Sequence, residues 1–263
     1  SRDGQNWNVS GSWPFTVLMN TSMETGAKLT GVTYPMPATV PGSVYDDLEK
    51  AGLIEDPYFE MNSLKCEWVA NRFWSYMTSF ERPANNGKHV RIVFRGLDYY
   101  AHIYVNDVKL GEHEGMYTPF IADITDILRD GENSITVVFE NAPNEMGQIG
   151  YTSRTFTQKA RFNYKWDFCT RLVNIGIYDD VYLDICDEPI CEPHIRYKDG
   201  KVTVEAKNEH FSAEISLRGK KIASAESEKT DNGSIVTLAV DEPELWFPNG
   251  AVKGRKTQPL YDI

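Results

Sequence analysis

The sequence predicts an all-β protein built from antiparallel β-sandwiches. Most apolar residues alternate with polar ones at a period of two or form short runs between turn residues, and a helical period is almost absent. Aromatic residues make up 12% of the 263 residues, a share that suits a sandwich core or a sugar-binding surface equally well. No strand–helix–strand rhythm indicates a dinucleotide-binding fold or a (β/α)8 barrel.

One short surface helix is expected over residues 43–51. Ser43 can serve as its N-cap, and Gly52 stands where a C-terminal cap belongs. The apolar positions follow helical spacing, so we expect one face of the helix to pack on the rest of the protein. These apolar positions are Val44, Leu48 and Ala51.

The predicted strands fall into two groups, one before residue 187 and one after residue 193. In the first group, Asn106 and Asp107 predict a tight turn between two strands, because both residues tolerate the left-handed backbone of such turns. The first group consists of residues 90–94, 101–105, 108–110, 134–139 and 181–185. The second group consists of residues 195–197, 202–206, 213–217 and 234–240.

A change of composition predicts a domain boundary at the end of the first group. Residues 187–193 contain two prolines and three acidic residues directly after a completed strand, which is typical of a linker. We therefore expect residues 1–187 to form one sandwich and residues 188–263 a small immunoglobulin-like one. The second has about five or six strands, fewer than a complete immunoglobulin-like domain, and residues 261–263 begin another. We expect this domain to be truncated at its C-terminus.

Composition and charge exclude several classes of partner. With 27 basic and 38 acidic residues, the chain has a formal net charge of −11. Such a chain has no general attraction for nucleic acid or anionic lipid. No apolar run reaches the roughly 18 residues that a membrane helix needs. We expect neither nucleic acid nor a membrane as a partner. The compartment stays open, with the cytoplasm slightly favoured for a bacterial protein.

The sequence predicts no cofactor and no metal site. The four cysteines lack paired CxxC spacing and are expected to be buried free thiols, and the five histidines lack the spacing of a zinc site. There is no glycine-rich phosphate loop and no G-x-S-x-G nucleophile motif. His102 is expected to be structural or solvated, and His113 is expected to lie in a loop. The residues alone contain no complete active site.

Residues 161–168 have an unusual composition. Four aromatic and three charged residues occupy eight positions with no clean period, so either aromatics face both sides or the backbone is irregular. Trp166 beside Asp167 suits sugar recognition. An indole offers a flat apolar face to sugar C–H groups, and a carboxylate accepts hydrogen bonds from paired hydroxyls. The alternative is a sandwich-edge strand with a solvated Asp167.

Several different short motifs also lie along nearly the whole chain, in a defined order. They are V-P-G at 40–42, F-R-G-L-D at 94–98, V-N at 105–106, G-M-Y-T-P-F at 115–120, G-I-Y at 176–178, L-W-F-P-N-G at 245–250 and Q-P-L-Y at 258–261. The motifs and their order resemble those of the non-catalytic N-terminal half of glycoside hydrolase family 2, specifically of its β-mannosidase-like branch. Within these motifs, residues 40–42, Asp98 and Asn106 are expected to be fold-keeping turns, and residues 245–250 to belong to a strand.

The resemblance implies a galactose-binding-like jelly-roll sandwich over residues 1–187, followed by a partial immunoglobulin-like sandwich over residues 188–263. It also implies that Trp166 packs against the terminal sugar of a substrate and that Asp167 holds its hydroxyls. Phe168 stands where this branch usually has Trp. The family's two catalytic glutamates lie on a (β/α)8 barrel that this sequence does not contain, so no catalytic residue is assigned.

The function that follows from the resemblance is that of an accessory part of a retaining exo-β-glycosidase, inactive by itself. The expected partners are a terminal β-mannoside or related β-hexoside and the missing C-terminal barrel of the same protein. Three alternatives stay open. They are a stand-alone lectin-like module, the same half of a β-galactosidase or β-glucuronidase, and a purely structural role for every aromatic residue.

Overall fold

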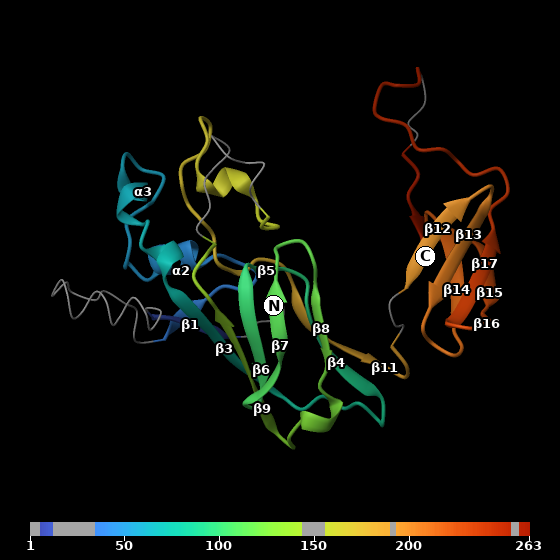
Figure 1. The fold of residues 1–263 in the computed structure, drawn as a ribbon, viewed down its shortest axis with the longest axis horizontal. Helices are drawn as coiled ribbons and strands as arrows, with labels where there is room; N and C mark the ends of the chain where they lie inside the picture. Colours follow the sequence, from blue (N-terminus) through green and yellow to red (C-terminus); the bar gives the residue numbers. More distant parts are fainter. Residues whose placement is uncertain (1–5, 13–34, 144–155, 190–192, 254–257) are drawn as a thin grey trace. The chain divides into compact units, whose positions relative to one another are not determined.

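The computed structural model describes residues 6–12, 35–143, 156–189, 193–253 and 258–263. Strands are the main secondary structure of these residues, which confirms the all-β prediction (Figure 1). The chain divides into two compact units, Ser1–Asp187 and Glu188–Ile263. None of the described helices is both long enough and apolar enough to cross a membrane.

The first unit is built from antiparallel sheets around one hydrophobic core (Figure 1). Its strands are β1 (Trp7–Ser12), β2 (Met36–Ala38), β3 (Phe73–Glu81), β4 (His89–Phe94), β5 (Leu97–Asp98), β6 (Tyr100–Val105), β7 (Val108–Glu114), β8 (Phe120–Asp123), β9 (Glu132–Phe139), β10 (Gly176–Ile177) and β11 (Val181–Cys186). One sheet has the order β2-β1-β3-β9-β6-β7, another has the order β11-β4-β8, and β5 pairs with β10. The two larger sheets contribute to the same core and so form the layers of a sandwich.

Alternation along the strands explains how the large sheet buries one face. In β9, Ile135, Val137 and Phe139 are buried, and the residues between them are half-buried. In the neighbouring strand β6, Ala101 lies opposite Phe139 and Ile103 lies opposite Val137, so buried side chains form rows across the sheet. Burying a large aliphatic or aromatic side chain of this kind contributes about 1.5–3 kcal/mol.

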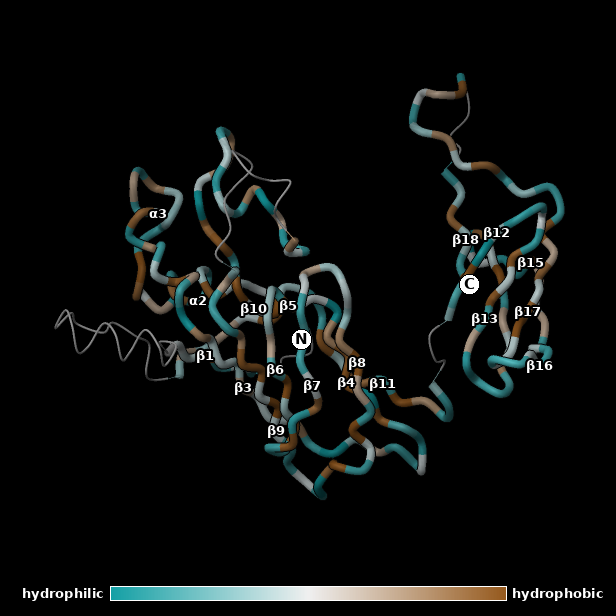
Figure 2. The backbone as a smooth tube through the Cα atoms, viewed as in Figure 1, coloured by the Kyte–Doolittle hydropathy of each residue, from teal (hydrophilic) through white to brown (hydrophobic). Residues whose placement is uncertain are grey.

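The strand predictions for this unit are confirmed, because each predicted range lies within an observed strand. Figure 2 shows the corresponding pattern, with hydrophobic stretches such as β9 and β4 separated by hydrophilic turns. The predicted turn is also confirmed, since Asn106 and Asp107 have φ values of 51° and 68°. The loop predicted at His113 is wrong. β7 continues to Glu114, because Gly111 packs beneath the ring of Phe120 and does not end the strand.

The predicted helix corresponds to α2 (Val44–Lys50), and its N-cap is confirmed. The Ser43 hydroxyl accepts a hydrogen bond from the Tyr45 backbone N–H at 3.2 Å. Val44 and Leu48 are buried as expected. Ala51 is exposed, because the helix ends at Lys50 and Ala51 lies beyond its last turn. Among the described residues, the other helical segments are α3 (Asn62–Lys65) and the 3-10 turns η1 (Val69–Asn71), η2 (Thr125–Ile127) and η4 (Arg161–Tyr164).

The second unit is also a small β-sandwich with its own core. Its strands are β12 (His194–Lys198), β13 (Lys201–Ala206), β14 (Ser212–Leu217), β15 (Lys220–Glu226), β16 (Glu228–Thr230), β17 (Gly233–Ala239) and β18 (Tyr261–Asp262). They form two sheets with the orders β12-β13-β17-β16 and β15-β14-β18. Val204, Ile215 and Val236 belong to the core between them. The sequence did not predict β15 and β16, because both strands are largely exposed and rich in charged residues.

The motif-derived expectations have mixed outcomes. Gly42 is confirmed as a tight position, because an added Cβ would lie only 2.3 Å from the Thr39 carbonyl oxygen. Asp98 is not a turn residue: it belongs to β5 and its side chain is fully buried. Residues 245–250 form no strand, and within the 258–261 motif the strand β18 starts only at Tyr261. Pro243 and Pro248 lack the N–H that a ladder position requires.

Candidate functional site

The candidate residues Trp166 and Asp167 lie on an irregular loop of the first unit, beyond the 3-10 turn η4. The Trp166 N–H donates to the Cys169 carbonyl at 3.0 Å, and the Cys169 N–H donates back at 3.5 Å. Asp167 and Phe168 therefore occupy the tip of a tight turn. Neither is in a strand, so the edge-strand alternative is wrong and the irregular backbone is confirmed.

The turn begins at a strained residue. Lys165 has φ 102° and ψ 137°, a conformation that favours glycine. Backbone strain of this kind persists only where the surrounding structure fixes the chain, and it is concentrated at functional sites. The Lys165 N–H donates to the Phe162 carbonyl at 3.1 Å, and the Leu172 N–H donates to the Asn163 carbonyl at 3.0 Å. These bonds close the loop on both sides of the turn.

The turn exposes a carboxylate and aromatic side chains, which together suit a polar ligand that also has an apolar face. Asp167 is exposed, Phe168 is 73% exposed, and Trp166 is half-buried. Within the described ranges, no hydrogen bond or ion pair occupies the Asp167 carboxylate. An unpaired carboxylate next to a partly exposed indole can accept hydrogen bonds from hydroxyl groups while the ring contacts C–H groups.

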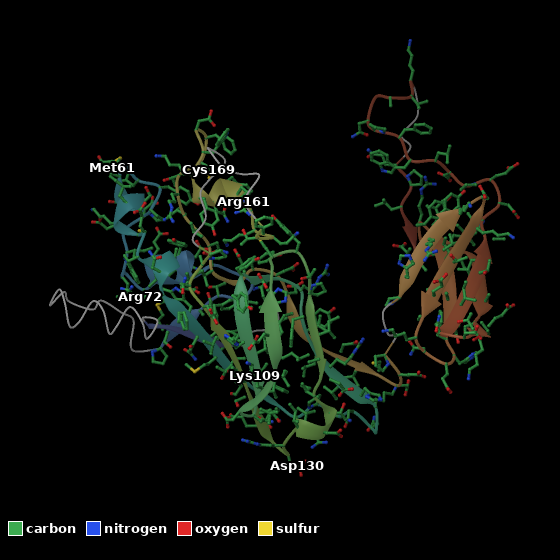
Figure 3. All side chains as sticks on the ribbon, in the orientation of Figure 1. Met61, Arg72, Lys109, Asp130, Arg161 and Cys169 are labelled. Atoms are coloured by element: carbon green, nitrogen blue, oxygen red, sulfur yellow. The ribbon has the colours of Figure 1, made fainter. Side chains whose placement is uncertain are left out.

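A second segment adds exposed apolar side chains at the same end of the first unit. The labelled residues Met61, Arg161 and Cys169 lie at this end, and Lys109 and Asp130 lie at the opposite one (Figure 3). The segment that contains α3 exposes several large apolar side chains. They are Leu53, Tyr58, Phe59, Met61 and Leu64, each more than half exposed. We call this set the α3 patch. Exposed apolar clusters of this kind commonly mark interaction surfaces.

The histidines and cysteines form no competing site in the described part of the chain. His102 is structural, with Nε2 at 2.8 Å from a Glu140 oxygen, and burial lowers the pKa of His113. Cys66 is a buried free thiol, Cys169 and Cys186 are half-buried ones, and Cys191 lies outside the described residues. No three His, Cys, Asp or Glu side chains among the described residues come together as metal ligands.

The sequence missed the residues that anchor this loop. Lys159 and Asn174 flank it, and both contact Asp98, which is buried on β5. Lys159 is one of several basic residues in this stretch, and its partner lies 61 residues earlier in the chain. No local pattern signals a pairing over that separation.

Family comparison agrees with this architecture. The glycosyl hydrolase 2 galactose-binding domain-like family matches residues 13–179, which include β3 to β10 and the Trp166–Asp167 turn. The first unit is thus a β-sandwich of the galactose-binding-domain-like class.

Comparison with known proteins identifies the branch. Beta-mannosidase B of Thermothelomyces thermophilus is 30% identical over 249 residues, which cover 85% of this chain and 29% of that protein. The beta-mannosidase of Mus musculus is 31% identical over 202 residues, covering 69% and 22% respectively. The crystal structure of a beta-D-mannosidase from Dictyoglomus thermophilum has the same fold, with a TM-score of 0.67 at 23% identity, covering 93% of this chain and 31% of that one.

The chain belongs to glycoside hydrolase family 2, and to its β-mannosidase-like branch. It spans between 22% and 31% of the length of these three relatives.

Proposed function

We propose that this chain is an accessory, sugar-contacting part of a retaining exo-β-glycosidase that hydrolyses terminal β-mannosides. In this proposal Trp166 packs against the terminal sugar and Asp167 accepts hydrogen bonds from its hydroxyls. The observation that carries the proposal is the tight turn itself, which exposes an unpaired carboxylate beside a half-buried indole. The β-mannosidase relatives support mannose as the sugar.

The reaction itself requires groups that we do not assign to this chain. Retaining hydrolysis needs two carboxyl groups about 5–5.5 Å apart on either side of the glycosidic bond. We propose that a catalytic (β/α)8 barrel of the same protein supplies both, and that the loop end of the first unit faces it. The α3 patch supports this partner, because its exposed apolar side chains suit a protein surface better than water.

A parallel substrate assay tests the proposed specificity. The full-length enzyme should give its highest kcat/KM on nitrophenyl β-mannoside when it is compared with the β-galactoside and the β-glucuronide. A higher kcat/KM on the β-galactoside or the β-glucuronide would instead indicate a β-galactosidase or a β-glucuronidase. The 263-residue chain alone should hydrolyse none of the three substrates, and hydrolysis by the chain alone would contradict an accessory role.

A lectin-like module is the second candidate, since an exposed Trp–Asp pair can bind sugar without any catalytic partner. One indole and one carboxylate cover only part of a sugar, and millimolar affinity corresponds to only about 4 kcal/mol. Calorimetric titration of the chain with mannose and mannobiose should therefore give no measurable binding. Micromolar affinity would favour the lectin.

A further inference from the structure

The loop that carries the Trp166–Asp167 turn is joined to the sandwich by a buried charge pair. The side chains of Lys159 and Asp98 have no solvent exposure, and Nζ of Lys159 donates a hydrogen bond to the Asp98 carboxylate. Removing two charges from water is costly, and burial raises the pKa of the Asp98 carboxyl while the Lys159 charge opposes that rise. Neither group can contact the proposed sugar, because both are inside the protein.

This pair connects the two ends of the loop. Nζ of Lys159 also donates to the backbone carbonyl of Asn174 at 2.8 Å. The Asn174 side-chain amide donates in turn to the second Asp98 oxygen at 3.4 Å. One ammonium group therefore binds the start of the loop at residue 159, its end at residue 174, and β5 of the sandwich.

Further bonds fix both ends to rigid elements. At the end of the loop, the Ser43 hydroxyl, which caps α2, donates to the Asn174 side-chain oxygen at 2.5 Å. Gly176, two residues after Asn174, pairs with Asp98 in the β5–β10 ladder. At the start of the loop, the Gln158 N–H donates to the Tyr99 hydroxyl at 3.3 Å.

The apolar residues that the loop buries lie mostly near its two ends, where Ala160 and Val173 are buried and Leu172 packs against the core. Phe162 and Phe168 are exposed, and Tyr164 is the one aromatic residue of the segment 161–168 that is fully buried. Its hydroxyl donates to the Pro143 carbonyl at 2.8 Å. Because these buried contacts lie at Tyr164 and near the ends of the loop, and not at its tip, the direction in which the turn projects depends on how those points are held.

We propose that Lys159 and Asp98 are positioning residues, which hold the loop so that the Trp166–Asp167 turn presents its side chains to the sugar. This inference rests on the proposed function for its biological purpose. Its physical content, a loop kept in place by one buried ammonium group, can be tested without any sugar.

Hydrogen exchange of the 263-residue chain tests the proposal through Lys159→Met, which keeps an unbranched side chain one atom shorter and removes the charge. The loop amides of Trp166 and Leu172, both hydrogen-bonded in the loop, should accelerate at least about tenfold more than the β9 amides, whose acceleration reports the loss of overall stability. Val137→Ala serves as the matched control. It removes buried volume from β9, so it should lower overall stability without selectively accelerating the loop amides.

A second variant covers the case in which an unpaired buried carboxylate prevents folding. Asp98→Asn combined with Lys159→Met leaves no buried charge and should show the same selective loop acceleration. Loop amides that exchange as in the unmodified chain, or that accelerate only in step with β9, would overturn the proposal. If the loop amides accelerate but Asp167→Ala leaves kcat/KM of the full-length enzyme unchanged, the result supports the claim that the buried pair holds the loop. The same result contradicts the proposed contact between Asp167 and the sugar.

Discussion

The base and the tip of the loop between residues 159 and 174 have opposite physical properties. At the base, Lys159 and Asp98 are completely buried and paired. At the tip, Asp167 is exposed and Phe168 is 73% exposed. Residues at the base therefore contribute to the stability of the fold, while residues at the tip contribute little to stability and are available for a ligand. Mutations in the two places should separate these contributions.

The largest effect on stability is expected at the base. Lys159→Met leaves the Asp98 carboxylate buried without its cation, and breaking a buried pair in this way costs about 3–5 kcal/mol. Chemical denaturation should show the loss as a lower midpoint with an unchanged slope. The double variant with Asp98→Asn should recover part of the loss. A single variant as stable as the unmodified chain would show that the pair is not needed to hold the base.

The next effect concerns a second buried carboxylate, Asp47 in α2. Burial raises its pKa to about 6 from an ordinary value of 3.8, and the hydrogen bond that one oxygen accepts from the Thr39 N–H offsets only part of that rise. The other oxygen is buried and has no hydrogen-bond partner among the described groups. The folded state therefore holds this proton more tightly than the unfolded state, and stability falls as pH rises from about 4 to about 6.

Asp47→Asn removes that charge and should stabilise the chain above pH 6 by about 1–3 kcal/mol, with no gain near pH 4. Melting temperatures measured from pH 4 to pH 8 would show the difference. The neighbouring exposed Asp46 gives the matched control, since Asp46→Asn removes a carboxylate from the same helix without removing a buried one. An equal stabilisation at pH 4 and pH 8 would contradict the assignment to the buried carboxylate.

A smaller effect is expected at the start of the turn, where Lys165 adopts φ 102°. Lys165→Gly relieves backbone strain of about 1–3 kcal/mol but adds flexibility to the unfolded chain, so a net gain of about 1 kcal/mol is expected. Lys165→Ala retains the strain and should be close to neutral. Thermal unfolding of the two variants distinguishes them, and a loss of stability in Lys165→Gly would contradict the strained conformation.

The smallest effects on stability are expected at the tip itself. Phe168→Ala and Asp167→Ala should each change the free energy of unfolding by less than about 0.5 kcal/mol, because both side chains are exposed. Phe139 is the buried counterpart, completely shielded in β9, and Phe139→Ala should cost about 3–5 kcal/mol. A large loss in Phe168→Ala would mean that the tip is packed against the protein.

Local patterns were sufficient for those parts of the fold in which one face of each strand is buried. The sequence predicts β6 and β9 because apolar and polar residues alternate in strands that bury one face. It does not predict β15, because most of the side chains of that strand are exposed and the alternation is weak. The unusual composition of residues 161–168 identified the turn, and its lack of a period indicated an irregular backbone. The Asp98–Lys159 pair could not be predicted, because two single charged residues far apart in the sequence carry no sign that they meet.

The proposed role of the tip depends on the Asp167 side chain more than on any other, and kinetics of the full-length protein on a β-mannoside can measure its contribution. Asp167→Ala should lower kcat/KM about ten- to hundredfold, the effect of losing a charged hydrogen bond worth about 1.5–3 kcal/mol. Asp130→Ala, an exposed carboxylate at the opposite end of the first unit, should leave kcat/KM unchanged (Figure 3). Equal kcat/KM values for Asp167→Ala and the unmodified enzyme would contradict the proposed contact between this turn and the sugar.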